Sequence, residues 1–423
     1  MKVIIYFFAF VFLYAMECGR AFPVHANSSL DRAVIISTRY YHFEVAAVFA
    51  HHFKNMGLDS HVFVGQTVVD ENYLGVGDWL RTYTPHLHRF SKGKHLNPTI
   101  LEYAKSKVLV IVTSDESSDF LSLCLHHNLY NTLYAGAERV LLIMHNANST
   151  EYLAQRCQDP KCYLIVLGEN VYNTAQMILS QAGMTHVNLR WMSSIHPLAP
   201  QYIAPRDPSG PTRFILQGIL TPGKRRDFNR LFACMIEIKR RHDIELVLIG
   251  KVATLGANLT IPLKLSNITT VVKWPDYLGF FRNVSSADYA ILFSKFDFYE
   301  HGRITSSIPT SLVSNLPIIL PNKLLSDYAC LRNQYVHRAT SMADDCSSVK
   351  AVLSLRHERQ QQMRNEVAFC VKQLLIESRA TLHDIVFGEN GNEGLDSNNG
   401  TLVIPDPDKV PFSSRQYSHR FCK

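Results

Sequence analysis

The 423-residue sequence lacks several patterns that define common protein classes. Its nine cysteines include no Cys-x-x-Cys pair, which disfavours a structural zinc site. Lysine and arginine form no continuous stripe although the net charge is +7, so the sequence argues against nucleic-acid binding and favours a small anionic ligand. Beyond the N-terminus, no apolar run approaches the roughly 20 residues of a membrane-spanning helix.

The N-terminus carries a targeting signal. Lys2 precedes an apolar run over residues 3–16, and Gly19-Arg20-Ala21 fits the small residues preferred before a signal-peptide cleavage site. We expect cleavage after Ala21, with an uncleaved type II anchor as the alternative. The mature chain is therefore expected in the secretory pathway, in the lumen of the Golgi or ER or secreted, and at a membrane only if this segment stays uncleaved.

Cysteine usage agrees with an oxidising compartment. Removal of the signal takes away Cys18 and leaves eight cysteines, an even number. Cys157 and Cys162 bracket a short turn and are the first choice for a disulfide, and Cys330 with Cys346 is a second candidate pair. Six N-glycosylation sequons give weak additional support for secretion; they start at Asn27, Asn148, Asn258, Asn267, Asn283 and Asn399.

From residue 33 onward, short apolar runs alternate with amphipathic stretches, a pattern typical of βα units and a parallel sheet. A helix is expected over residues 42–56, where Phe49 and Phe53 lie on one apolar stripe and Gly57 ends it. A Tyr-, His- and Gly-rich region over 67–97 is expected to form surface loops of a cleft. The expected strands are 33–37, 61–65, 108–113, 140–144 and 162–167, with further helices from Phe120 and Val171.

Five prolines in residues 197–211 predict an interdomain linker, because proline at that density opposes both helix and central strand. The alternation then restarts, with strands expected at 214–217, 245–249, 270–272, 289–293 and 316–320, and helices from Arg226 and over 347–381. The expected fold class is α/β, with two Rossmann-like doubly wound domains facing a cleft. The expected segments are a signal peptide or anchor (1–21), an N-terminal acceptor-side domain (22–200), a linker (201–212), a C-terminal donor-binding domain (213–387) and a loop-rich tail (388–423).

Segments of the second half occur in an order shared with a known family. They are FILQG at 214–218 with KRRDF at 224–228, LVLIG at 246–250, SADYAIL at 286–292 and NLPII at 315–319. Together they resemble the donor-binding domain of GT-B glycosyltransferases, the retaining family-4 type in particular, and the resemblance extends over residues 30–380. It implies transfer of a hexose from a nucleotide diphosphate sugar to a glycan, protein or lipid acceptor, without a cofactor and without a metal site.

The candidate donor-phosphate residues lie at a strand end and at two helix starts. Gly218 allows close backbone approach to a phosphate, and Arg225 and Arg226 add forked donors. Ser306 and Ser307 open a further helix, where hydroxyls and free N–H groups form an anion nest. A solvated charge pair at the arginines and simple capping by the serines are the alternatives. We expect alanine at both arginines to weaken nucleoside diphosphate binding with the fold intact.

The family pattern places two glutamates across the loop before Pro317. The second position is Thr310, and the first falls near Gly302, with Glu300 two residues away. We assign Glu300 and Thr310 to the donor sugar or ribose, although a carboxylate would bind a hydroxyl more strongly than threonine. This departure leaves open a divergent subfamily, a different donor, or lost activity.

His145 is the candidate catalytic residue of the N-terminal half. It follows the strand at 140–144, and the resemblance implies that a histidine in this place reaches the donor sugar, where it can donate a hydrogen bond or shuttle a proton. The other histidines are expected to be exposed or hydrogen-bonded bystanders. His42 and Glu44 follow the first strand, where the family usually carries a glycine-rich loop; the bulky residues 39–41 replace it, which implies different acceptor contacts or a blocked cleft.

Two other classes of protein stay open. A catalytically inactive GT-B module that binds a glycan or protein partner is compatible with the missing glutamate and glycines. A two-domain α/β protein that closes on a small ligand would need no basic phosphate loop in its second half. A fold by itself does not decide among these functions.

Overall fold

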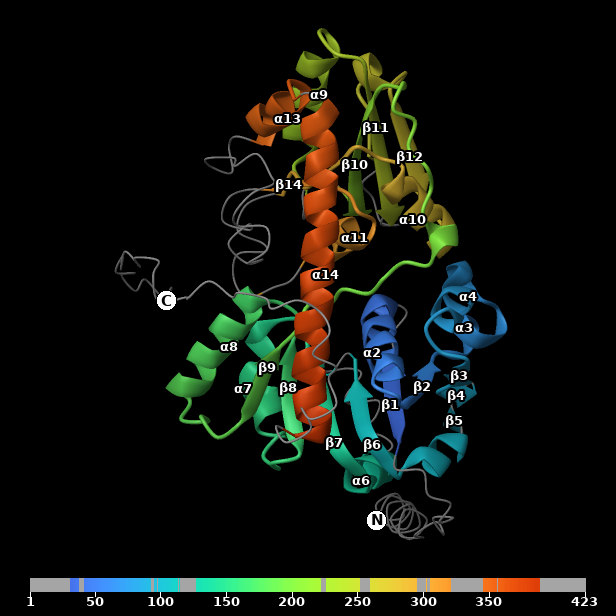
Figure 1. Cartoon of the computed structure of the whole chain (residues 1–423), viewed down its shortest axis with the longest axis vertical. Helices are drawn as coiled ribbons and strands as arrows, with labels where there is room; N and C mark the ends of the chain where they lie inside the picture. The colour runs from blue at the N-terminus through green and yellow to red at the C-terminus, as the bar shows by residue number, and fades with distance from the viewer. Residues whose placement is uncertain are drawn as a thin grey trace, which may run out of the picture.

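The computed structural model describes residues 31–37, 42–92, 95–96, 98–112, 114, 127–221, 226–251, 259–294, 302, 305–320, 345–355 and 357–388. The chain forms two α/β units, each built on a parallel sheet (Figure 1). The expected signal segment, the tail after Gly388, the helix start at Phe120, and the candidates Arg225 and Glu300 lie outside the described residues.

The first unit contains a seven-stranded sheet in the order β3-β2-β1-β6-β7-β8-β9. Its central strands are buried on both faces, as the near-continuous apolar runs of parallel strands require. The strands are β1 (Arg32–Ser37), β2 (Asp59–Val64), β3 (His86–Arg89), β6 (Ser106–Ile111), β7 (Ala137–Met144), β8 (Cys162–Val166) and β9 (Asn188–Trp191). The helices are α2 (Phe43–Asn55), α3 (Gln66–Asp70), α4 (Val76–Arg81), α6 (His127–Gly136), α7 (Thr150–Ala154) and α8 (Glu169–Gln181).

The expectation of surface loops over residues 67–97 is wrong. This region contributes α3, a 3-10 turn (Tyr73–Gly75), α4, the sheet strand β3 and the short antiparallel pair β4 (Ser91–Lys92) and β5 (His95–Leu96). Trp79 and Leu80 of α4 are fully buried. The strand was hidden because β3 has the sequence HLHR, with none of the β-branched residues that mark strands.

The second unit contains a five-stranded sheet in the order β12-β11-β10-β13-β14. The helix expected from Arg226 begins at Phe228, and the Asp227 side chain caps it by accepting a hydrogen bond from the backbone N–H of Arg230 at 3.0 Å. The strands are β10 (Thr212–Ile219), β11 (Ile244–Lys251), β12 (Thr269–Lys273), β13 (Tyr289–Ile291) and β14 (Ile318–Ile319). The helices are α9 (Phe228–Lys239), α10 (Tyr277–Ser285), α11 (Ser307–Val313), α13 (Asp345–Leu353) and α14 (His357–Phe387).

The helical stretch expected over 347–381 is two helices, and the second, α14, runs along both units (Figure 1). Near its start, Arg364 Nη2 donates to the carbonyl of Ala287 in the second unit at 2.7 Å. Nearer its end, Ser378 Oγ accepts from the backbone N–H of Ser193 at 3.0 Å, and Arg379 Nη2 donates to the carbonyl of Asn55 at 3.1 Å. The last turns of α14 therefore pack against the first unit.

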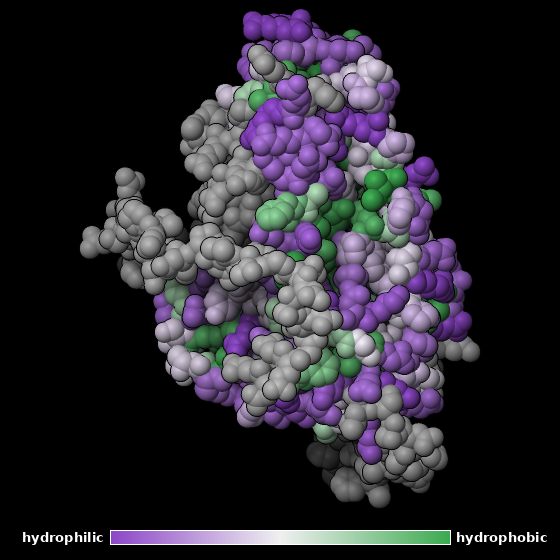
Figure 2. All heavy atoms as spheres, viewed as in Figure 1, coloured by the Kyte–Doolittle hydropathy of each residue, from purple (hydrophilic) through white to green (hydrophobic). Residues whose placement is uncertain are grey.

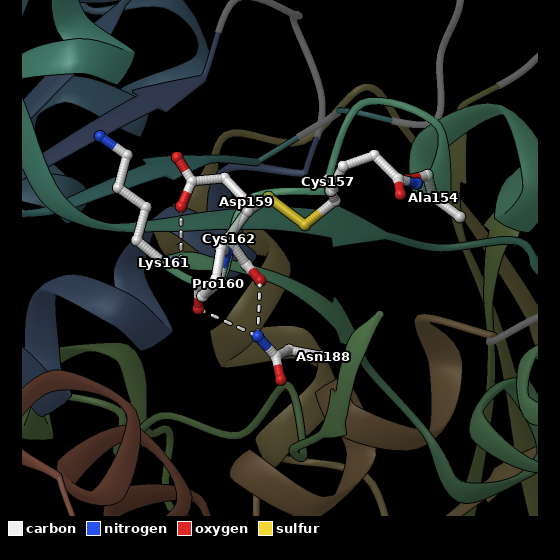
Figure 3. The surroundings of a disulfide bond; sticks show 8 residues. Ala154, Cys157, Asp159, Pro160, Lys161, Cys162 and Asn188 are labelled. Atoms are coloured by element: carbon white, nitrogen blue, oxygen red, sulfur yellow. Dashed lines mark hydrogen bonds between the residues drawn. A yellow bond between two sulfur atoms is a disulfide. The ribbon is translucent and has the colours of Figure 1, made fainter. Parts of the chain in front are cut away.

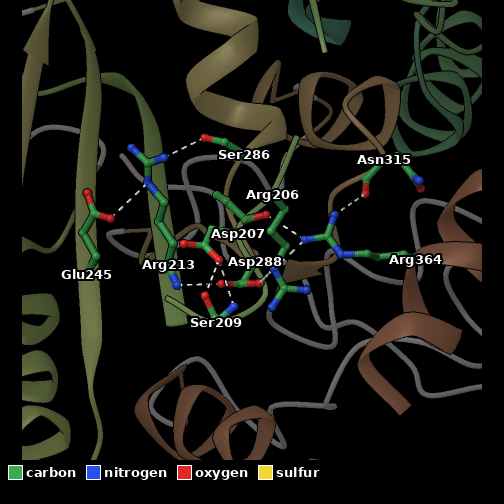
Figure 4. A network of polar contacts seen from close by, with 10 residues as sticks. Arg206, Asp207, Ser209, Arg213, Glu245, Ser286, Asp288, Asn315 and Arg364 are labelled. Atoms are coloured by element: carbon green, nitrogen blue, oxygen red, sulfur yellow. Dashed lines mark hydrogen bonds and ion pairs between the residues drawn. The ribbon is translucent and has the colours of Figure 1, made fainter. Parts of the chain in front are cut away.

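A buried carboxylate fixes the path between the units (Figure 4). Asp288 has a side chain only 4% exposed, pairs with Arg206 of the linker, and lies 3.8 Å from Arg364 of α14. It also accepts a hydrogen bond from the backbone N–H of Arg213 at the start of β10, at 2.7 Å. Burial raises the pKa of Asp288, although the arginines act in the opposite direction. This one side chain ties the linker, β10 and α14 together.

The expected disulfide between Cys157 and Cys162 is present, with their Cα atoms 5.2 Å apart (Figure 3). Asn188 of β9 holds the same turn by donating to the carbonyl of Pro160 at 3.0 Å. A second disulfide joins Cys234 of α9 to Cys346 of α13. The candidate pair of Cys346 with Cys330 is therefore wrong, because packing of α13 on α9 brings together cysteines 112 positions apart.

An aromatic cluster connects the two units. Trp79 of α4 lies 4.7 Å, between ring centroids, from Tyr277 and 6.0 Å from Phe281, both on α10, and His196, which precedes the proline-rich stretch, packs edge-on against Trp79 at 5.3 Å. In Figure 2 the described surface of the visible face is mainly hydrophilic, and hydrophobic residues gather where the upper unit meets the lower one. Among the described residues, no helix combines the length and apolarity needed to cross a membrane.

Candidate functional site

The two units meet at the carboxyl ends of their strands. The backbone N–H of Ala147, just after β7, donates to the carbonyl of Gly302 in the second unit at 2.9 Å. Gly302 has φ +67, and a Cβ placed there would lie 2.7 Å from the Ala147 methyl and 3.1 Å from Thr174 on α8. A side chain does not fit at this contact.

His145 follows β7, as expected, and lies next to His42, which precedes α2. The two imidazole rings stack with their centroids 4.1 Å apart. His42 has φ +65, a backbone conformation that non-glycine residues adopt rarely and that is often found at functional sites. The Glu44 carboxylate lies 3.4 Å from His42 Nδ1. The structure thus adds His42 and Glu44 to the candidate site, beside the single histidine that the sequence indicated. The sequence feature that could have identified them is their position after the first strand.

The charge of Glu44 is set by its surroundings. Burial by itself raises the pKa of this carboxyl, but the hydrogen bond and charge of His42, with a smaller contribution from His145, outweigh burial and lower the pKa below its ordinary value. Glu44 is therefore ionised at neutral pH. An ionised carboxylate beside Nδ1 orients the ring of His42.

The sheet of the second unit ends in two facing glycines. Gly218 at the end of β10 has φ +112, and Gly250, its partner in register on β11, has φ +146. A Cβ on Gly250 would collide with the carbonyl oxygen of Gly218. Both positions therefore require glycine, and the backbone at this edge carries no side chain that would keep a ligand away. Gly218 was a candidate from the sequence; Gly250 was not.

Arg226 lies beneath this edge and not on a solvated helix start. Only 3% of the residue is exposed. Its Nη2 donates to the carbonyl of Gln217 at 3.0 Å and to Ser307 Oγ at 2.8 Å. Gln217 Nε2 in turn donates to the carbonyl of Ser307 at 2.8 Å and to Ser311 Oγ at 3.0 Å. The guanidinium therefore ties the end of β10 to the start of α11.

The helix α11 starts at Ser307, as the sequence predicts, and its residues divide between two faces. Ser307 and Ser311 are buried towards Gln217. Ser306 is exposed, and Thr310, four residues later, is partly exposed and donates its backbone N–H to the carbonyl of Ser306 at 3.1 Å. Residues four apart lie on one side of a helix, so Ser306 and Thr310 form its open face.

An exposed aromatic ring that the sequence did not indicate lies at the same edge. Trp274 follows β12, is 40% exposed and has φ +50. Its backbone N–H donates to the carbonyl of Gly250 at 3.1 Å, and Lys251 Nζ lies 4.8 Å from the centre of its ring. Trp274, Gly250 and Gly218 therefore form one continuous edge at the carboxyl ends of β12, β11 and β10.

Comparison with known proteins identifies the fold. Neither a family model nor a curated protein matches the sequence. Among solved structures, the chain is similar to sucrose-phosphate synthase from Thermosynechococcus elongatus, with a TM-score of 0.52, 10% identity and coverage of 84% of this chain and 98% of that chain. It is also similar to α,α-trehalose 6-phosphate synthase from Burkholderia multivorans, with a TM-score of 0.53, 9% identity and coverage of 85% and 98%. The two parallel sheets and these similarities define the GT-B fold of glycosyltransferases.

Proposed function

We propose that the chain is a glycosyltransferase that transfers a sugar from a nucleoside diphosphate sugar to a glycan, protein or lipid acceptor in the secretory pathway. The observation that carries the proposal is the contact between Ala147 and Gly302. It brings the loop after β7, with His145, against the donor-side loop of the second unit. Sites of doubly wound folds lie at the carboxyl ends of the strands, and here both sets of ends contribute to one place.

The diphosphate is assigned to the edge formed by Gly218 and Gly250. Bare backbone at these strand ends allows close approach, and the exposed Ser306 adds a hydroxyl. Arg225 would supply the cation that neutralises the leaving diphosphate, the largest electrostatic demand of the reaction. Arg226 is a positioning residue, since its guanidinium is already engaged by Gln217 and Ser307.

The sugar and the nucleoside are assigned to opposite sides of the diphosphate. His145, with His42 stacked on it and Glu44 behind, faces the transferred sugar, and a retaining outcome is the expectation by resemblance. Thr310 on the open face of α11 would bind a ribose hydroxyl, with Glu300 nearby in sequence. The exposed ring of Trp274 offers a stacking surface for the base.

A non-catalytic module is the second candidate function. One observation favours it: Thr310 occupies the position of the family's second glutamate, and Gly302, near the position of the first, has no room for a side chain. Such a module would bind a glycan or a protein partner in the same cleft and transfer nothing.

A kinetic comparison separates the two candidates. Purified mature protein is first screened against nucleotide sugars by thermal shift, where a donor at 100 times its Kd stabilises the fold by about 2.7 kcal/mol. With the donor found, His145→Ala should retain nucleoside diphosphate affinity but lower turnover, because the histidine acts on the sugar. His186→Ala, at an exposed histidine of the first unit, is the control and should match wild type. Donor binding without turnover in the wild type supports the module, and unchanged turnover in His145→Ala shows that another residue faces the sugar.

A further inference from the structure

Three histidines gather on the sheet of the first unit, away from the cleft. His61 lies on β2 and is paired in register with His86 on β3, and His88 is two residues further along β3. Residues two apart on a strand point to the same face, so the sheet itself brings the three imidazoles together. One ring nitrogen from each lies within 4.8 Å of those of the other two.

The distances between these nitrogens fit a shared ligand. His61 Nδ1 lies 3.0 Å from His88 Nε2. Two nitrogens bound tetrahedrally to one zinc ion at 2.0–2.1 Å are about 3.4 Å apart, so only a small movement separates this arrangement from a coordinated one. His61 also stacks on His86, with ring centroids 4.5 Å apart. The neighbouring strands β2 and β3 thus hold three candidate ligands that need little rearrangement of their side chains to bind one ion.

One carboxylate orients two of the rings. Asp59, which begins β2, has Oδ2 2.9 Å from His61 Nε2 and Oδ1 3.1 Å from His86 Nε2. A carboxylate on one ring nitrogen fixes the tautomer and directs the other nitrogen to a metal, and this arrangement is usual for metal-binding histidines. In His61 the nitrogen left open, Nδ1, is the one that faces His88.

We propose that His61, His86 and His88 bind a divalent transition metal ion, Zn²⁺ by preference, with Asp59 orienting the rings. Three imidazoles suit zinc and leave the fourth position to water. The site lies at the start of β3, the edge strand of the sheet, whereas the residues assigned to glycosyl transfer follow the carboxyl ends of the strands. Its role is to fix that edge strand, and it is independent of the cleft.

Aromatic rings cover one side of the histidine cluster. His88 stacks on Phe63 with ring centroids 4.8 Å apart, and the ring of His61 lies tilted against that of Tyr103 at 4.4 Å. From the sequence these histidines were expected to be exposed or hydrogen-bonded bystanders; the pairing of β2 with β3 is what brings them together.

The test is metal content and metal-dependent stability of full-length protein prepared without a histidine tag. The protein is stripped with a chelator, dialysed against ZnCl2 and analysed for bound zinc; one zinc per chain is expected, with a rise in Tm. His86→Gln and His88→Gln should lose both, and Asp59→Asn should bind zinc about 10–100-fold more weakly. His242→Gln, at an exposed histidine of the second unit, should match wild type.

Two results would overturn the proposal. One is that the wild-type protein retains no more zinc than His88→Gln does. The other is that His86→Gln and His88→Gln bind zinc as tightly as the wild-type protein. Circular dichroism of the zinc-free variants separates lost binding from lost folding, and His86→Gln is the gentler change because that side chain is 42% exposed. Replacement of the zinc by Co²⁺ gives an independent readout, since four-coordinate Co²⁺ with nitrogen ligands absorbs visible light. Transfer activity in the cleft should not depend on any of these changes.

Discussion

Replacing Arg226 with alanine should destabilise the second unit and weaken nucleotide binding together. The buried guanidinium donates to the Gln217 carbonyl and to Ser307 Oγ, and hydrogen bonds from a charged group contribute about 1.5–3 kcal/mol each. Since both acceptors would be left buried and partly unsatisfied, we expect a loss of about 2–4 kcal/mol in the free energy of unfolding. The sequence alone indicated that removal of this arginine would leave the fold intact.

Urea unfolding followed by tryptophan fluorescence measures this loss. Arg240→Ala, at an exposed arginine after α9, is the matched control and should change stability by less than about 0.5 kcal/mol. A double-mutant cycle with Ser307→Ala isolates the direct contact, and we expect a coupling energy of about 1–2 kcal/mol. Nucleoside diphosphate affinity should fall about tenfold in Arg226→Ala through displacement of α11. Wild-type stability in Arg226→Ala, together with zero coupling to Ser307, would show that the guanidinium does not hold α11 to β10.

Three further predictions concern the contact between the units, the response to acid, and processing. Gly302→Ala should lower kcat/KM about tenfold, because the added methyl forces the two units apart. Gly183→Ala is the control and should leave kcat/KM unchanged, since Gly183 has a similar positive φ but no atom near the added methyl. Equal effects of the two substitutions would show that the contact between the units is not involved. Burial lowers the pKa of His196 to about 4 and that of His52 to about 3, so the stability present above pH 6.5 should be lost as the pH falls towards 4 and then 3. In His196→Phe the melting temperature should depend less steeply on pH across this range. An unchanged dependence on pH would contradict the assignment of this loss of stability to His196. N-terminal sequencing of the secreted product should begin at Phe22, whereas an intact N-terminus found only in membranes would establish the anchor.

The fold class could be predicted because parallel strands buried on both faces have a distinctive sequence. Apolar runs such as residues 140–144 of β7 and 214–216 of β10 are typical of such strands when amphipathic stretches separate them. The disulfide of Cys157 with Cys162 was predictable because its loop is short. The place of His145 was predictable because a residue that follows a buried parallel strand lies at the edge where such folds bind ligands.

The remaining features depend on contacts between distant parts of the chain, which local sequence patterns do not reveal. The edge strand β3 carries polar residues on both faces and has no strand pattern of its own; its pairing with β2 makes it a strand. Cys234 and Cys346 meet only because α13 packs on α9. Gly250 is required because its φ is positive and because Gly218 faces it, and φ angles such as those of Gly250 and Trp274 cannot be derived from residue type.

The burial of Arg226 shows the same limit within the site. The local sequence around a basic residue at the start of a helix does not show where its side chain points. The side chain can point to solvent, to a ligand, or, as in Arg226, into a network with Gln217 and Ser307. Position along the chain identifies the edge of the sheet at which Arg226 lies. Only the packing of α11 against β10 shows which groups at that edge are already engaged and which, such as Ser306, are open.

Calorimetric titration of the mature protein with uridine, guanosine and adenosine diphosphates measures whether the cleft holds a nucleotide. We expect one of these nucleotides to bind saturably, with one molecule bound per chain. Ser306→Ala should weaken this binding by removal of a hydroxyl on the open face of α11, whereas Ser209→Ala, at an exposed serine of the linker, should leave it unchanged. A wild-type protein that binds none of the three nucleotides would contradict the assignment of a nucleotide-sugar site to this edge.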